Sequence, residues 1–355
     1  MNIKPLKIDD ISVKVPILQG GMGVGVSLSG LASAVTNAGG IGVISSAQIG
    51  FKEEGFEDNS FLCNIKAIKK EIAIAKEKCK NGILGMNIMV ASTYYADYVK
   101  TAIEAGIDII ISGAGLPTAL PKLVKGSKVK IAPIVSSLKA AKVILKLWDK
   151  HDNTTADMVV IEGPKAGGHL GFHADKLQVE QENFDDTVVS IIEEVKKYRE
   201  KYSKDIPVIV AGGVFDGKDM AKYLKLGASG VQMATRFVAT EECDASIEFK
   251  KAYVNAKKED ITIVKSPVGM PGRALLNPFV EKTKKENIKV KKCFNCLEPC
   301  NPKNTPYCIT KALINAVKGD VDNGLIFCGA NVDKIDKITT VQEIFDEIEK
   351  EVSNE

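Results

Sequence analysis

The chain has 355 residues, of which 45% are hydrophobic and 26% are charged, so it can bury a large core and has the composition of a globular protein. Its net charge of +3 is small for this length, so the sequence does not show the strong excess of basic residues that is typical of nucleic-acid-binding proteins. Neither a signal-peptide core nor a run of about 18 apolar residues occurs, and eight cysteines are too few for a disulfide scaffold, so we expect a cytoplasmic protein without a membrane span.

Short apolar runs alternate with amphipathic stretches along the first two-thirds of the chain. The strand candidates are residues 15–20, 41–46, 83–90, 107–113, 130–136, 157–163, 207–213 and 230–235. The helix candidates between them include residues 62–80, 94–105, 137–150, 185–202 and 217–226. Near-continuous apolar runs are typical of parallel strands covered on both faces. Eight of them, separated by helices, predict an α/β fold of the (β/α)8 TIM barrel type, with a doubly wound open sheet as the alternative.

Residues 159–173, VVIEGPKAGGHLGFH, combine a buried strand with a Gly-rich turn and a histidine. Glycines let the backbone approach a ligand closely and present N–H groups to an anion. His169 follows them directly, and an imidazole beside such a loop can act as a general base or acid. The alternative is a tight turn whose histidine makes only a structural hydrogen bond. Taken alone, the stretch leaves both interpretations open.

Small and polar residues follow most of the predicted strands, at the edge where ligands bind in both candidate folds. The loops after the seventh and eighth strands, around Gly213 and residues 232–235, are the usual phosphate site of a barrel. Arg236 either adds charge there or lies on the surface. The sequence has no GxGxxG after the first strand and no GxxxxGK[ST], so we expect the phosphate to belong to a mononucleotide or a sugar phosphate.

The alternation of strands and helices stops after residue 237. We therefore divide the chain into a barrel, residues 1–243, a capping insertion after the eighth strand, residues 244–335, and a C-terminal segment, residues 336–355. The amphipathic stretch 339–352 would close the barrel as its last helix. The insertion holds four closely spaced cysteines, Cys293, Cys296, Cys300 and Cys308. They could bind zinc or an iron–sulfur cluster, or simply be buried in a tight Pro-rich loop, so no metal site is assigned.

Seven motifs together resemble the nitronate monooxygenase family, formerly called 2-nitropropane dioxygenases, and the related FMN-dependent enoyl-ACP reductases. They are ILQGGMG (17–23), LASAVTNAGGIGVIS (31–45), GMNIMV (85–90), ISGAG (111–115), EGPKAGGHLG (162–171), PVIVAGGV (207–214) and GVQMATRFVATEE (230–242). The resemblance covers residues 10–245 and, more loosely, the rest. It implies a TIM barrel that holds non-covalent FMN, with a homodimer as an option for the assembly.

The resemblance also implies roles for individual residues. His169 would be the catalytic histidine. The FMN contacts would be Gly21, Met22, Asn87, Glu162, Gly167, Gly213, Gln232, Met233, Ala234 and Thr235, with the first two facing the isoalloxazine ring. Two positions depart from the family pattern: relatives often have Gln in place of Glu162, which is more typical of the enoyl-reductase branch, and Gly in place of Ala234.

The function that the resemblance implies is oxidation of alkyl nitronates with O₂ to a carbonyl compound and nitrite. If neutral nitroalkanes are also substrates, His169 would remove the α-proton, a task that suits a pKa near neutrality. One alternative is NAD(P)H-dependent reduction of an enoyl thioester by the same flavin. Another, from a different class, is a flavin- or metal-binding sensor whose cysteine segment contacts a partner. The ring of strand-end residues around His169 favours an enzyme.

Overall fold

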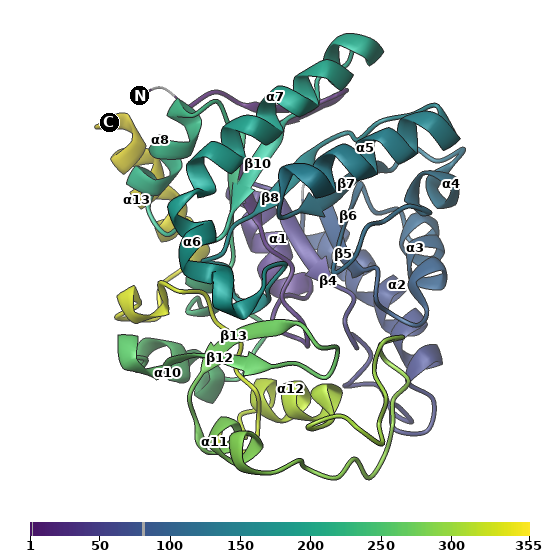
Figure 1. The fold of residues 1–355 in the computed structure, drawn as a ribbon, viewed down its shortest axis with the longest axis vertical. Helices are drawn as coiled ribbons and strands as arrows, with labels where there is room; N and C mark the ends of the chain where they lie inside the picture. Colours follow the sequence, from purple (N-terminus) through teal and green to yellow (C-terminus); the bar gives the residue numbers. More distant parts are fainter. Residues whose placement is uncertain (2, 80–81) are drawn as a thin grey trace.

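The computed structural model describes residues 1, 3–79 and 82–355, and in this part of the chain eight parallel strands form one sheet (Figure 1). The strands are β3 (Ile17–Gln19), β4 (Gly42–Ser45), β5 (Leu84–Met89), β6 (Ile109–Gly113), β7 (Lys130–Val135), β8 (Val159–Glu162), β10 (Val208–Ala211) and β11 (Gly230–Met233). β3 and β4 stand at the two ends of the sheet order, and a parallel bridge between Leu18 and Ile41 joins them. The prediction of a TIM barrel is therefore confirmed, and the open sheet is excluded.

The strands are apolar throughout because both of their faces are buried. In β6, Ile109 and Ile111 point into the barrel and share its interior cluster, whereas Ile110 packs against the surrounding helices. In β8, Val160 belongs to the interior and its two neighbours to the outer layer. This alternation within a continuous apolar run is what parallel strands covered on both sides require.

Helices surround the barrel and follow the predicted positions. The helices are α1 (Ser29–Asn37), α2 (Ser60–Lys78), α3 (Tyr95–Glu104), α4 (Leu120–Val124), α5 (Leu138–Asp152), α6 (Leu177–Glu182), α7 (Phe184–Tyr202), α8 (Gly217–Lys225), α9 (Thr235–Val238) and α13 (Val341–Ser353). The stretch predicted over 62–80 is α2, and residue 80 lies outside the described residues. None of the helices within residues 1, 3–79 and 82–355 has the length and apolar character needed to cross a bilayer.

The C-terminal helix α13 packs beside both α8 and α1. A side chain on Gly217, at the start of α8, would collide with Glu351 and with the carbonyl of Ile348, so glycine permits this close approach. Thr340 begins α13 with a capping box, in which it accepts a hydrogen bond from the Glu343 N–H. These contacts support the proposed role of residues 336–355 in completing the helical layer.

The N-terminus forms a hairpin that the sequence analysis did not predict. β1 (Leu6–Ile8) and β2 (Ile11–Val13) pair antiparallel. Leu6, Ile8 and Val13 are buried in the same cluster as the inward-facing strand residues, so the hairpin seals the amino-terminal end of the barrel. The opposite end, where the strands finish, is left for a ligand.

Residues 244–335, called the cap below, lie across the carboxyl ends of the strands (Figure 1). They contain α10 (Ile247–Val254), β12 (Ile261–Lys265), β13 (Pro271–Leu275), α11 (Pro278–Lys285) and α12 (Ile309–Val317). The cap has an apolar cluster of its own, which includes Val264, Phe279 and Leu325. A two-residue strand of the barrel loop, β9 (Gly168–His169), pairs with β13 and makes a three-stranded sheet. This pairing attaches the cap to the loop that carries His169.

Candidate active site

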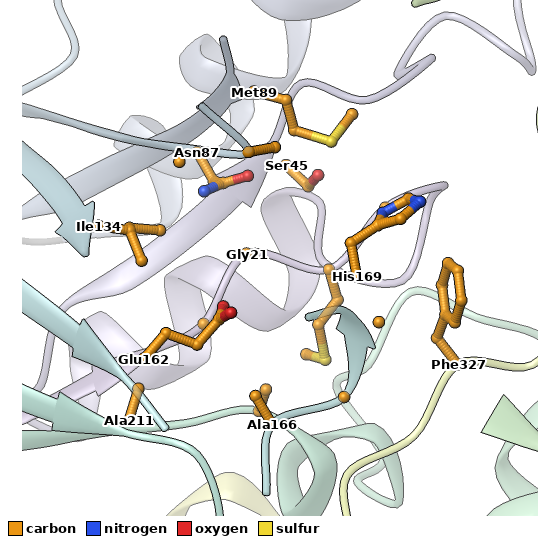
Figure 2. A pocket seen from close by; sticks show the side chains of 18 of the residues that line it. Gly21, Ser45, Asn87, Met89, Ile134, Glu162, Ala166, His169, Ala211 and Phe327 are labelled. Carbon is orange, nitrogen blue, oxygen red and sulfur yellow. The ribbon is translucent and has the colours of Figure 1, made fainter. Parts of the chain in front are cut away.

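A cavity of about 450 Å³ lies between the carboxyl ends of the strands and the cap. The predicted residues that line it are Gly21, Met22, Asn87, Glu162, Gly167, His169, Gly213, Gln232, Ala234 and Thr235. Figure 2 shows side chains from opposite sides of the barrel, among them Asn87 and Glu162, gathered around it. Met233 is placed differently: its side chain is 1% exposed and belongs to the hydrophobic core. A ligand could therefore meet Met233 only through its backbone.

The loop after β10 has a backbone conformation that glycine favours. Gly212 and Gly213 have φ values of 93° and 96°, in the left-handed region. A β-carbon on Gly213 would lie 2.8 Å from the Lys165 side chain. The Gly213 carbonyl accepts a hydrogen bond from Asn331 Nδ2 at 2.6 Å, and no described residue pairs with the N–H of Gly212 or Gly213. Unpaired N–H groups at a strand end suit an anion.

The loop after β11 adds a hydroxyl group to this candidate anion site. The Thr235 hydroxyl accepts a hydrogen bond from the Gly329 N–H at 2.9 Å and keeps its own hydrogen to donate. The methyl group of Ala234, where relatives often have Gly, lies against Gly20. A β-carbon on residue 20 would approach this methyl group to 3.2 Å, so the glycine at position 20 leaves room for it. Arg236 points away, to the Phe215 carbonyl and Glu347. Because we predict that they bind a phosphate, we call residues 212–213 and 232–235 the phosphate loops.

On the opposite side of the cavity the backbone runs close to a polar side chain. A β-carbon on Gly21 would overlap the Asn87 side chain at 2.4 Å, so only glycine leaves this wall flat. Met22 is held by its N–H, which donates to Ser27 Oγ at 2.8 Å. Asn87 Nδ2 donates to the Ile111 carbonyl and leaves its oxygen free for a ligand. A flat wall with a free amide oxygen, facing an anion site, fits the ring and phosphate of FMN.

Glu162 and His169 are the titratable groups whose surroundings matter most. Burial raises the pKa of Glu162 to about 7, although the N–H of Gly171 stabilises its carboxylate. Burial lowers the pKa of His169 to about 4, so the ring is uncharged at neutral pH. The near-neutral pKa that the sequence analysis expected for His169 is therefore not what its environment produces.

His169 is held in a fixed orientation by the cap. Its Nε2 lies 2.6 Å from Ser266 Oγ, and its ring centroid lies 5.3 Å from that of Phe327 (Figure 2). Within the described residues, Nδ1 has no protein partner. In one tautomer Nε2–H donates to Ser266, and Nδ1 has a lone pair that can accept a proton. In the other tautomer the Ser266 hydroxyl donates to Nε2, and Nδ1–H can donate to a substrate oxygen.

Sequence reasoning missed the cap residues that support the site. They are Ser266, Arg273, Phe327, Gly329 and Asn331. Arg273, for example, reaches the carbonyls of Pro164 and Ala166 across 109 and 107 positions of sequence. A single arginine in the strand-like segment PGRAL carries no signal of such a partner. Only the fold brings these residues to the barrel loops.

The four clustered cysteines lie in the cap, and one of them reaches the cavity. Cys296 lines the cavity, and burial raises its pKa to about 11, so its thiol is protonated at neutral pH. Across the part of the chain that the structure describes, no group of three or more His, Cys, Asp or Glu side chains is arranged to hold a metal ion. The cysteine segment instead packs as part of the cap.

A family model for nitronate monooxygenase matches residues 4–351. The chain belongs to the nitronate monooxygenase family. A probable nitronate monooxygenase of Staphylococcus saprophyticus is 28% identical over 296 residues, which cover 77% of this chain and 78% of that protein. This family member also resembles (3aS,4S,5R,7aS)-5-hydroxy-7a-methyl-1-oxo-octahydro-1H-indene-4-carboxyl-CoA dehydrogenase of Mycobacterium tuberculosis, with 29% identity over 272 residues, 77% of this chain and 66% of that protein.

Solved structures agree with the barrel described above. FabK from Thermotoga maritima is 29% identical and superposes with a TM-score of 0.73 over 96% of this chain and 94% of that one. Nitroalkane oxidase from Streptomyces ansochromogenes also has a TM-score of 0.73, over 96% of each chain, and at 18% identity it supports the fold alone. This member of the nitronate monooxygenase family is therefore an oxidoreductase whose relatives carry names of differing activities.

Proposed function

We propose that the chain binds FMN in the cavity and oxidises alkyl nitronates with O₂ to a carbonyl compound and nitrite. The observation that carries this proposal is the arrangement of the phosphate loops and an uncharged histidine around one cavity. Gly213 and Thr235 would hold the phosphate, and Gly21 and Asn87 would lie against the flavin ring. FMN, when bound, accepts electrons from the substrate and passes them to O₂.

His169 would bind the substrate beside the flavin. A nitronate has already lost its α-proton, so the tautomer with Nδ1–H can donate a hydrogen bond to a nitronate oxygen. A neutral nitroalkane still carries that proton, and the tautomer held by Nε2–H and Ser266 would let Nδ1 remove it. Phe327 covers one side of the imidazole and helps to exclude water from it.

A second candidate, NAD(P)H-dependent reduction of an enoyl thioester, is favoured by a specific feature of the cavity. One part of its wall is apolar and comes largely from the cap: Met89, Leu297, Ile309, Leu313, Leu325 and Phe327. Such a wall suits an acyl chain or ring system better than a small nitronate. Glu162, which is more typical of the enoyl-reductase branch, and a relative named as a carboxyl-CoA dehydrogenase of an indene ring system favour the same candidate.

Anaerobic mixing separates the two candidates. The flavin-loaded protein is mixed either with a preformed alkyl nitronate or with NADH or NADPH, and bleaching of the visible flavin absorption is followed. We expect rapid bleaching by the nitronate and little by the nicotinamides, with nitrite formed once O₂ is admitted. Rapid bleaching by a nicotinamide with no response to nitronate would replace the first candidate with the second.

A further inference from the structure

Arg273 of the cap lies beneath the Gly-rich loop, residues 163–168, and is almost completely buried, with 8% of its surface exposed. Its Nη1 donates to the Pro164 carbonyl at 2.9 Å and also to the Ala166 carbonyl. In the pairing of β13 with β9, Arg273 stands opposite Gly168, and Gly272 stands opposite His169. One guanidinium thus fixes the loop that leads to the candidate catalytic residue.

This buried charge has no carboxylate partner among residues 1, 3–79 and 82–355. The ionisable group whose charge would act on Arg273 is Cys328, but burial raises the pKa of its thiol to about 12, so the thiol is uncharged at neutral pH. A buried cation without a counter-ion is costly, and two carbonyl oxygens offset only part of that cost. The arrangement therefore calls for an anion nearby.

The geometry of the peptide bond shows on which side the anion would bind. In a trans peptide the C=O of one residue and the N–H of the next point in opposite directions. Because the carbonyls of Pro164 and Ala166 face Arg273, the N–H groups of Lys165 and Gly167 face away from it. Both residues line the cavity, and neither N–H has an acceptor within the described chain. Arg273 thus turns two peptide donors toward the ligand.

We propose that Arg273 is a positioning residue that orients the Gly-rich loop as an anion site and balances the charge of the bound phosphate. The inference rests on the proposed function for the identity of that anion, the phosphate of FMN. It makes the cap part of cofactor binding, since the charge comes from β13 and not from a barrel loop. Because the guanidinium polarises the peptide bonds that it contacts, it also strengthens the donors on their far side.

The test compares FMN with riboflavin, which has the same ring system but no phosphate. Flavin-free protein is titrated with each flavin, and quenching of flavin fluorescence gives the two affinities. Arg273→Met should weaken FMN binding by about 10- to 100-fold, the usual worth of a hydrogen bond to a charged group. Riboflavin affinity should change by less than about 3-fold, because the lost interaction acts on the phosphate.

Two further variants keep the comparison sharp. Arg273→Lys keeps the charge and a donor nitrogen but loses the planar fork, so its FMN affinity should lie between those of the wild type and Arg273→Met. It serves as the test if Arg273→Met does not fold. Lys250→Met is the matched control, because Lys250 is also buried and donates to a backbone carbonyl, that of Glu241, but does not line the cavity. Its two flavin affinities should stay as in the wild type.

The outcomes are distinct. Unchanged FMN affinity in a folded Arg273→Met variant, or an equal loss for FMN and riboflavin, would overturn the inference while leaving the proposed function in place. A wild-type protein that binds neither flavin would instead overturn the proposed function and, with it, the identity of the anion. A loss confined to FMN, partly restored by lysine, would establish the role of Arg273.

Discussion

At the scale of single residues, the cavity shifts two ionisation equilibria in opposite directions. Burial disfavours the charged form of each group, so the pKa of Glu162 rises to about 7 and that of His169 falls to about 4. Near neutral pH, His169 is uncharged and Glu162 is close to half ionised. Groups with such displaced pKa values are characteristic of functional sites.

Replacing His169 should separate its two proposed roles. His169→Asn should lower turnover of a neutral nitroalkane by about 10²–10⁴, the usual worth of positioned proton transfer, and turnover of preformed nitronate much less. The wild-type nitroalkane rate should persist until the pH approaches about 4, because the ring stays unprotonated above its pKa. Both rates are measured on flavin-loaded protein. Equal losses with the two substrates would rule out the base.

Glu162 should make the flavin-free protein less stable as the pH rises. Its folded pKa is raised, so the folded state keeps a proton that the unfolded state releases above pH 4.5. The stability contribution is present below pH 4.5 and is lost as the pH rises through about 7. Glu162→Gln removes this loss, so the stability difference between variant and wild type should grow by roughly 2–3 kcal/mol from pH 4.5 to 8. Urea unfolding at several pH values measures it, and a pH-independent difference would contradict the shift.

The sequence predicted the barrel side of the site far better than the cap side. Gly213 stands at the end of an apolar run, and His169 follows the Gly-rich turn after another, so the local pattern was enough to single them out. Ser266 is 97 positions from His169, and nothing in its neighbourhood marks it as a partner. The pKa of His169 likewise depends on burial under the cap, which no motif records.

At the scale of secondary-structure elements, two properties decided what could be predicted: the length of an element and whether it depends on a partner far away in the sequence. The eight barrel strands are apolar on both faces and are bracketed by helices, so their pattern is strong. The hairpin of β1 and β2 has three residues in each strand, too few to show a period. β9 has two residues and exists only because β13 pairs with it. An element that forms only through a partner far away in the sequence cannot be predicted from its own residues.

The loop after β10 gives a prediction at this scale. Gly213→Val should weaken FMN binding by at least about 10-fold, because the side chain would enter the Lys165 side chain at the phosphate and strain a left-handed φ. Gly126→Val is the matched control. Gly126 also has a left-handed φ, of 86°, but it does not line the cavity, and a β-carbon on it would meet nothing within 4 Å. If a folded Gly213→Val protein bound FMN as the control does, the phosphate would have to lie elsewhere.

At the scale of the whole molecule, barrel and cap line one cavity. The hairpin of β1 and β2 closes one end of the barrel, and the cap covers the other. Ser266 orients His169, Arg273 holds the Gly-rich loop, and Asn331 and Gly329 contact the phosphate loops. Every one of these partners lies in the cap, so removing residues 244–335 would leave the phosphate loops and His169 without support.

The most direct measurement is the identity and amount of flavin in the purified protein. The protein is purified after expression with its full chain, its visible spectrum is recorded, and the flavin released by heating is identified by chromatography and mass. We expect the phosphate loops to bind a single phosphate, and the sequence has no GxGxxG after the first strand, so the released flavin should be FMN, close to one per chain. Release of FAD, or a colourless protein that does not take up added FMN, would contradict the account.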